Sequence, residues 1–290
     1  MARIIAVGKF DGVHLGHRRL LNEGRRWAKE LGASFAAFTF PFQREALLPL
    51  SVRLRLLGEL TDEVIVRDLH DLIGLAADEF LRMLQKDFGA VGLIMGPGHR
   101  FGKGRGGNPD YAREWGRRHG LMVRVLGPFL CQGRPVSARY IRDHLKRGEV
   151  REARLLLGRY PPLFGKRIQG AKVGRRLGYP TVNLELSPEQ LRPRAGVYLA
   201  WAFWAGGEGP GLFYLGDRPT FPRLPPAAEV HLFEAPRPEP EGTVEVHLME
   251  FLREDRRFPT EEALVEQIGR DVTRGQELLE VLPTPEPLSR

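Results

Sequence analysis

The sequence has one cysteine, Cys131, among 290 residues. The chain can therefore form no internal disulfide and cannot build a cysteine-based metal site. It also lacks an apolar run of about 18 residues, the length that a membrane-spanning helix needs. Its first residues lead directly into a short apolar segment, without the hydrophobic region of a signal peptide. We therefore expect no membrane partner and a cytoplasmic location.

Lysine is scarce, with 7 residues among the 44 basic ones, and the net charge is +8. The basic residues are scattered without interleaved aromatics or a recognition helix, so we expect no nucleic-acid partner. A positive field of this kind also attracts the phosphates of small molecules. Hydrophobic content of 42% and charged content of 28% are typical of globular proteins, and 290 residues suit two domains.

The most informative stretch is a glycine-rich loop, GKFDGVHLGH, at residues 8–17. It follows an apolar run at 4–7 and precedes helical spacing, which predicts a strand, a loop and a helix N-terminus. Such an end offers free N-H donors and partial positive charge to phosphate. Similar turns in other α/β folds bind nothing, but His14 and His17, three residues apart at the start of a helix, favour phosphate chemistry. The loop is neither a P-loop nor a GxGxxG fingerprint, which argues against a Walker-type NTPase and a dinucleotide dehydrogenase.

Alternating strands and helices continue through the first half of the chain. Strands are predicted at 34–40, 64–66, 91–95 and 121–126, and helices at 51–60, 78–88 and 111–119. This alternation predicts a Rossmann-like parallel sheet, in which ligands gather at the carboxyl ends of the strands. Four segments fall at such ends: the first loop, Thr39-Phe40, a glycine-rich loop at 96–107, and the segment that begins at Val136.

A domain boundary is predicted near Gly158. Helical spacing over 143–157 ends there, and Pro161 and Pro162 begin an extended stretch. We therefore expect domains at 1–158 and 159–290. In the second, short apolar segments at 197–204, 212–215, 228–233 and 244–251, followed by helical spacing over 261–281, predict a small antiparallel β-barrel with a C-terminal helix.

A second glycine-rich stretch spans residues 170–184, GAKVGRRLGYPTVNL. Its glycines could form a turn around a phosphate chain. The Thr181 hydroxyl and the Asn183 amide oxygen, two apart on an extended segment, are hard ligands suited to Mg²⁺. On these residues alone, an irregular loop in which both side chains satisfy backbone groups is the better explanation of the pattern.

Both stretches resemble a known family. GxFDGxHxGHxxLL is similar to the signature of the nucleotidyltransferase superfamily, and most of all to the N-terminal half of bifunctional bacterial riboflavin kinase/FAD synthetases. GxxxGRxLGxPTxN resembles the riboflavin kinase motif of the same family. Later family features also occur in order, at 196–198, 216–221, 228–231, 252–253 and Phe258. Three positions depart from the family's nucleotidyltransferase motifs: Pro41, Gly98 and Ala138.

The resemblance implies an N-terminal nucleotidyltransferase domain and a C-terminal kinase barrel. Riboflavin would be phosphorylated to FMN, and FMN adenylylated to FAD, with ATP as co-substrate and Mg²⁺ as cofactor. By resemblance, the catalytic residues are His14, His17 and Glu229, and the metal ligands are Thr181 and Asn183. The nucleotide-binding residues are Gly8, Phe10, Asp11, Gly12, Gly16, Ser137, Arg142, Gly170, Gly174, Gly178 and Pro180. The flavin-binding residues are Thr39, Phe40, Phe101 and Arg253.

Three questions stay open at this point. Glu229 and Glu245 lie in similar segments, EVHLFE and EVHLME, and only the resemblance favours Glu229 as the base. The departures at Pro41, Gly98 and Ala138 leave a second interpretation open, in which the protein is a riboflavin kinase that has lost the adenylyltransferase activity. A non-catalytic flavin-binding or nucleic-acid-binding protein is a more distant alternative. We expect a monomer or a weak homo-oligomer.

Overall fold

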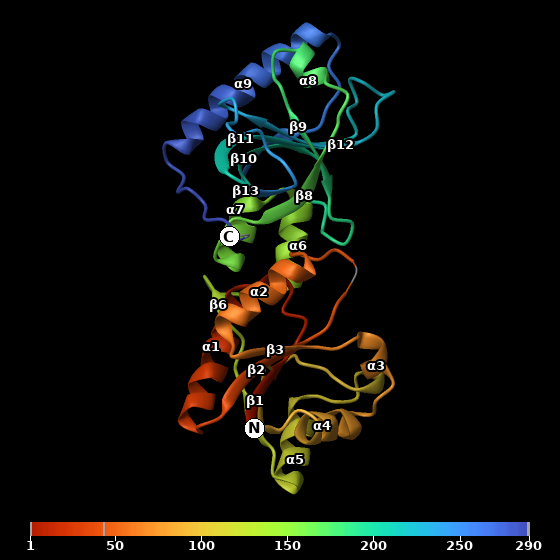
Figure 1. The fold of residues 1–290 in the computed structure, drawn as a ribbon, viewed down its shortest axis with the longest axis vertical. Coiled ribbons are helices and arrows are strands. Elements are labelled where there is room, and N and C mark those ends of the chain that lie inside the picture. The colour runs from red at the N-terminus through yellow and green to blue at the C-terminus, as the bar shows by residue number, and fades with distance from the viewer. Residues whose placement is uncertain (1, 43, 289–290) are drawn as a thin grey trace. The chain divides into compact units, whose positions relative to one another are not determined.

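The computed structural model describes residues 2–42 and 44–288, and this part of the chain forms two compact units (Figure 1). The first unit comprises the chain up to residue 42 and Leu50–Ala138, and the second comprises Arg44–Pro49 and the chain from Arg139 onward. Within the second unit, Ala46 pairs with Gln190, whose side-chain amide donates to the Leu47 carbonyl at 3.4 Å. None of the helices formed by the described residues is both long and apolar enough to cross a membrane.

The first unit is built on a five-stranded parallel sheet with the order β3-β2-β1-β4-β5. The predicted α/β architecture is therefore confirmed. The strands are β1 (Arg3–Val7), β2 (Ser34–Thr39), β3 (Glu63–Val66), β4 (Ala90–Met95) and β5 (Met122–Val125). The helices are α1 (Leu15–Glu30), α2 (Leu50–Leu60), α3 (Leu69–Ile73), α4 (Ala77–Lys86) and α5 (Pro109–His119), with short 3-10 turns at Asp11–Val13 and Lys103–Arg105 and a small hairpin of β6 (Leu130–Cys131) and β7 (Arg134–Pro135).

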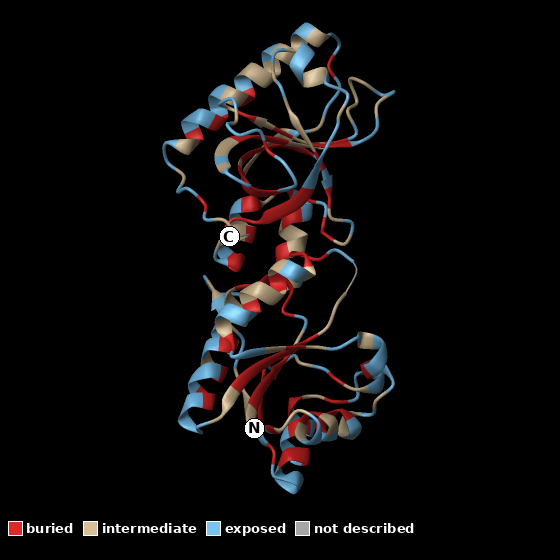
Figure 2. Ribbon diagram, in the orientation of Figure 1, coloured by how far each residue is buried: buried red, intermediate tan, exposed pale blue. Residues whose placement is uncertain are grey.

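Helices cover both faces of this sheet. Ile5 and Phe38 point to one face, where they join a core with Leu84 of α4 and Trp115 of α5. On the other face α1 approaches closely, because a Cβ at its Gly24 would lie 2.3 Å from the Phe35 ring. Successive strand residues point to opposite faces of the sheet, and helices cover both faces. The central strands are therefore apolar throughout and are buried (Figure 2).

The second unit begins with two helices, α6 (Ala138–Arg147) and α7 (Val150–Leu157). The sequence predicts one continuous helix over 143–157, and this is wrong. Gly148 adopts a left-handed backbone with φ 78, and the Glu149 N-H donates to the His144 carbonyl at 2.9 Å. Glycine takes that conformation without a steric penalty, so the chain turns there while the apolar spacing continues.

A closed six-stranded barrel follows, with the order β10-β11-β12-β9-β8-β13. It confirms the predicted antiparallel barrel. Its strands are β8 (Pro162–Ile168), β9 (Val182–Leu186), β10 (Gly196–Trp204), β11 (Gly207–Gly216), β12 (Ala227–Leu232) and β13 (Thr243–Glu254), and α8 (Val173–Arg176) lies between β8 and β9. The segments of β8 and β9 are predicted as extended backbone but not as strands of the barrel. The proline at the start of β8 is typical of a linker. β9 is short and directly follows a glycine-rich turn, so neither segment has the pattern of a barrel strand.

The barrel is accompanied by the C-terminal helix α9 (Glu261–Leu279), as predicted (Figure 1). Thr260 caps it, because its Oγ1 accepts a hydrogen bond from the Ala263 N-H at 3.2 Å. Gly275 and Leu278 are buried against the barrel, and a Cβ at Gly275 would lie 2.8 Å from the Phe233 ring. The helix therefore covers one side of the barrel.

Candidate active sites

The loop after β1 places two imidazole rings at the start of α1. His14 occupies the N-cap position, and its Nδ1 accepts a hydrogen bond from the His17 backbone N-H at 3.3 Å. Because Nδ1 is the acceptor, the neutral His14 ring carries its proton on Nε2. The two rings stack with centroids 3.6 Å apart and an interplanar angle of 15°. The pair therefore lies at the positive end of the helix dipole, which favours an anion.

The backbone beneath this loop is fixed by buried groups. The Gly8 N-H donates to the Phe38 carbonyl of β2 at 3.0 Å. Asp11 is buried, and so is Thr39, whose hydroxyl donates to the Lys9 carbonyl at 3.4 Å. Phe10 is also buried and has φ 49, a left-handed backbone that is uncommon for a side chain of this size. The conformation of the loop is thus set by its neighbours in the sheet.

Arg53 is a buried residue of α2 that the sequence analysis missed. Its guanidinium donates to the Lys9 carbonyl at 2.9 Å and to the Phe40 carbonyl at 3.0 Å, and it lies 4.4 Å from the centre of the Phe42 ring. Burial lowers the pKa of Arg53 to about 10, an effect that Asp11 opposes. Arg53 thus joins the loop after β1 to the loop after β2. The spacing in the sequence could have indicated that Arg53 is buried. Arg53 lies four residues before the buried Leu57, so both fall on the apolar face of the helix.

The glycine-rich loop at 96–107 follows β4, which is the neighbour of β1 in the sheet. Because β1 lies between β2 and β4, the loops after β1 and β4 diverge at a switch point, where α/β sheets bind ligands. Phe101 lies in the core of the unit, 5.6 Å from the Phe80 ring, and only 7% of it is exposed. Ser137 belongs to the first unit and directly precedes α6, whereas Arg142 is part of α6 in the second unit.

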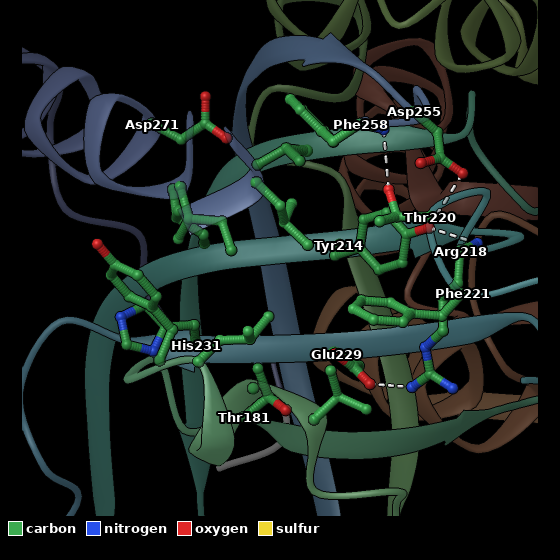
Figure 3. Close-up of a pocket in the computed structure, with 18 of the residues that line it drawn as sticks. Thr181, Tyr214, Arg218, Thr220, Phe221, Glu229, His231, Asp255, Phe258 and Asp271 are labelled. Carbon is green, nitrogen blue, oxygen red and sulfur yellow. Dashed lines mark hydrogen bonds and ion pairs between the residues drawn. The ribbon is translucent and has the colours of Figure 1, made fainter. Parts of the chain in front are cut away.

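Strand register brings three polar residues of the barrel into one row. Tyr214 of β11 pairs with Glu229 of β12, and Glu229 pairs with Asn183 of β9. Residues directly opposite in antiparallel strands point to the same face, so the three side chains share one side of the sheet. Glu229 and Thr181 both line a cavity of about 140 Å³ (Figure 3).

Glu245 lies elsewhere. It is 1% exposed, and its Oε1 lies 2.5 Å from Nε2 of the equally buried His247. It also accepts a hydrogen bond from the Leu288 N-H at 2.7 Å. The two glutamates that look alike in sequence therefore have different surroundings: Glu229 lines the cavity, and Glu245 belongs to a buried pair.

The glycine-rich turn before β9 shapes the site around Asn183. A Cβ at Gly170 would lie 2.2 Å from the Asn183 amide, so a larger residue there would displace that side chain. Gly174 accepts a hydrogen bond from the Tyr179 N-H at 2.8 Å, and Gly178 follows α8. The Pro180 carbonyl accepts a hydrogen bond from His231 Nδ1 at 2.9 Å, which ties the turn to β12.

The other wall of the cavity is mainly apolar and includes Leu264 and Ile268 of α9. Arg253 also lines it, and its Nε donates to Asp271 Oδ2 at 2.8 Å. Asp271 is buried, and its other oxygen accepts a hydrogen bond from Gln267 at 2.8 Å. The Arg253 guanidinium is thereby held at an apolar wall, which suits a flat, partly polar ring system.

Arg218 is the second residue that the sequence analysis missed. It lies in the 216–221 segment, whose resemblance to the family was noted without a role for its arginine. Its Nη2 is ion-paired with Glu229 (Figure 3). The same nitrogen donates to Asn183 Oδ1 at 3.2 Å. The three residues are far apart in sequence, so only the strand register reveals the contact.

Metal binding by acidic or histidine clusters is not observed: within residues 2–42 and 44–288, no three His, Cys, Asp or Glu side chains converge to hold an ion. The oxygens of Thr181 and Asn183 are neutral. Neutral oxygens of this kind suit a hard cation that draws most of its ligands from bound phosphates.

Comparison with known proteins adds to these observations. The riboflavin kinase family model matches residues 157–279, and the FAD synthetase family model matches residues 1–140. The chain is 31% identical over 283 residues to the bifunctional riboflavin kinase/FMN adenylyltransferase of Haemophilus influenzae, covering 92% of this chain and 91% of that protein. It is 32% identical to the protein of the same name from Pseudomonas fluorescens, covering 95% and 92%, and 30% identical to that of Escherichia coli, covering 94% and 92%.

A solved structure, described as a macrolide-efflux protein from Streptococcus pneumoniae, superposes with a TM-score of 0.83. It covers 97% of this chain and 95% of its own, at 24% identity, and shows the fold alone.

The fold and the two sites define a transferase class, in which one unit presents a helix start with two histidines and the other a barrel cavity with a carboxylate. The chain belongs to the family of bifunctional riboflavin kinase/FMN adenylyltransferases.

Proposed function

We propose that this chain phosphorylates riboflavin to FMN in the barrel and then adenylylates FMN to FAD in the first unit. Membership of the family supports both activities. The structural observation that carries the proposal is the cavity that Thr181, Glu229 and Arg253 line together. We assign the adenylyltransferase to residues 1–158, a range that also takes in α6 and α7 of the second unit, and the kinase to residues 159–290.

In the kinase step, Glu229 accepts the proton of the primary hydroxyl of riboflavin. That oxygen then forms a bond to the γ-phosphorus of ATP, the bond from the γ-phosphorus to the bridging oxygen breaks, and ADP leaves. Arg253 and the apolar wall formed by α9 orient the flavin ring, and the turn formed by Gly170, Gly174, Gly178 and Pro180 holds the phosphates. Positioning and charge neutralisation dominate such transfers. Glu229, Arg253 and Gly174 accordingly line one cavity.

Thr181 and Asn183 would hold Mg²⁺ on the ATP phosphates. Their oxygens are hard and neutral, so the two residues fit an ion that draws its other ligands from the phosphates. When bound, Mg²⁺ neutralises charge on the β- and γ-phosphates.

In the adenylyltransferase step, a phosphate oxygen of FMN attacks the α-phosphorus of a second ATP, and pyrophosphate leaves. His14 and His17 stabilise the charge that develops on the phosphates, and no covalent enzyme intermediate is needed. Backbone groups of Gly8, Phe10, Asp11, Gly12 and Gly16, with Ser137 of the same unit, bind the nucleotide. Phe40 faces the flavin side of the site, and the buried Thr39 and Phe101 support that side from within the unit.

The experiment is a time course with the full chain, riboflavin, ATP and Mg²⁺, in which chromatography separates riboflavin, FMN and FAD. FMN should rise first, and FAD should follow at its expense. FMN without FAD would reduce the function to a kinase, the outcome that Pro41, Gly98 and Ala138 would explain. An absence of FMN would reject the proposal.

We also propose a cytoplasmic location and small-molecule substrates as the only partners, with the chain acting as a monomer or a weak homo-oligomer. Light scattering across a concentration series tests the oligomeric state.

A further inference from the structure

Arg218 lies between two residues to which the kinase step assigns different tasks. Its guanidinium is ion-paired with the Glu229 carboxylate, and it also donates to Asn183 Oδ1 at 3.2 Å and to the Pro225 carbonyl at 3.1 Å. The Arg218 and Glu229 side chains are 11% and 16% exposed, so this ion pair is largely shielded from water. One cation therefore contacts both the proposed base and a proposed metal ligand.

The backbone of Arg218 is fixed from the opposite side. It has φ 52, in the left-handed region, and its N-H donates to Tyr214 Oη at 2.8 Å. Burial raises the pKa of Tyr214, so the hydroxyl stays protonated and donates to Asp255 Oδ2 at 3.0 Å. A Cβ at Gly216 would lie 2.3 Å from that Asp255 oxygen, so glycine makes room for this network. Figure 3 shows both hydrogen bonds. The guanidinium can thus change partners while its backbone stays in place.

The ion pair conflicts with catalysis by Glu229. The carboxylate oxygen that contacts the guanidinium is occupied, so it is not free to contact the hydroxyl group of the flavin. The terminal phosphate of ATP is a competing partner, since the arginine fork binds phosphate oxygens in pairs. We propose that Arg218 exchanges the Glu229 carboxylate for the terminal phosphate of ATP when the nucleotide binds.

This exchange, which rests on the kinase function proposed above, has two effects at once. It places a cation on the phosphoryl group that is transferred, and it releases Glu229 to accept the hydroxyl proton of the flavin. The base thereby becomes available only when the phosphoryl donor is in place.

The first test is kinetic and uses the full chain. Initial rates of FMN formation are measured for Arg218→Ala and Arg218→Lys while ATP and riboflavin are varied separately. Arg218→Ala should lower kcat by about 100-fold and raise the KM for ATP, and leave the KM for riboflavin unchanged. Arg218→Lys keeps the positive charge but lacks the paired donors of the planar guanidinium, so it should recover part of the lost kcat.

The matched control is Arg223→Ala, an exposed arginine on the same connection between β11 and β12. It should behave as the wild type. A purely structural Arg218 would instead give variants in which both KM values and the melting temperature change together. That outcome, or an unchanged kcat, would overturn the proposal.

The second test measures binding of a non-hydrolysable ATP analogue with Mg²⁺ by calorimetry. Glu229→Gln removes the competing carboxylate, so the analogue should bind about fivefold more tightly, the order expected for one ion pair. The gain should be smaller for ADP, which lacks the terminal phosphate, and absent in the Arg218→Ala/Glu229→Gln double variant. The nucleotide site proposed in the first unit is common to all variants and serves as an internal reference.

Unchanged affinity in Glu229→Gln, or a gain that persists without Arg218, would contradict the exchange. Failure of the wild type to form FMN would instead reject the kinase function itself, and the two outcomes are therefore distinguishable.

Discussion

The two sites are assembled in different ways. At the start of α1, His14 and His17 are three residues apart, and the helix itself stacks their rings. In the barrel, Asn183, Arg218 and Glu229 come from separate segments and meet through the register of β9, β11 and β12. The first site therefore depends mainly on local spacing, and the second on correct pairing of distant strands. Substitutions should have correspondingly different effects at the two sites.

The largest effect is expected for Glu229→Gln, compared with Glu245→Gln on the similar strand. The first should lower the rate of FMN formation by about 100- to 10,000-fold, the range for loss of a general base, with little change in melting temperature. The second should keep its turnover but lose about 1–3 kcal/mol of unfolding free energy, because the buried hydrogen bond to His247 is disrupted. Rate assays and thermal unfolding on both variants separate the two roles, and a reversed pattern would show that the base is misassigned.

His17→Ala should cost about 100-fold in FAD formation, the order typical of one donor to a developing anion. FMN formation should continue, so FMN accumulates. His70→Ala is the control, because its side chain is 94% exposed in the same unit. Chromatography of both products measures the outcome. Equal loss of both activities would mean that the two sites do not work separately.

Arg53→Met tests whether the first site also needs distant contacts. Two buried carbonyls, of Lys9 and Phe40, would lose their donor, which should lower the free energy of unfolding by about 1–3 kcal/mol. FAD formation should fall more than FMN formation. Arg55→Met on the same helix is the control, since Arg55 is partly exposed and pairs with Glu59 at the surface. If both variants lose FAD formation equally, the buried bridge is not what supports the loop.

The smallest effect concerns Glu149, at the break between α6 and α7. Hydrogen bonds from Arg147 and His144 lower its pKa from 4.5 to about 2. The resulting stabilisation is present above pH 4.5 and is lost as the pH falls toward 2. The side chain is 40% exposed, so solvent limits the contribution to about 1 kcal/mol or less. Unfolding curves of Glu149→Gln and the wild type should differ slightly at pH 7 and converge near pH 2, and a constant difference would argue against this linkage.

Much of the first unit could be predicted because its signals are local. Apolar runs alternate with helical spacing, and the histidines of the first loop mark a helix start. Arg53 was the exception, since a charged residue on a helix is usually solvated. In the barrel, β8 and β9 were not predicted as strands because a proline and a glycine-rich turn conceal their starts. The break at Gly148 was missed because the apolar spacing continues across it.

The sequence by itself determined the alternation of elements, the helix start that bears His14 and His17, and the glycine-rich turn before Asn183, because each depends on residues within a few positions of one another. Only the tertiary structure decided that Glu229 lines the cavity while Glu245 lies in a buried pair, and that Arg218 contacts Glu229 and Asn183. Strand register sets these contacts, and register depends on pairing between segments that the local sequence does not specify.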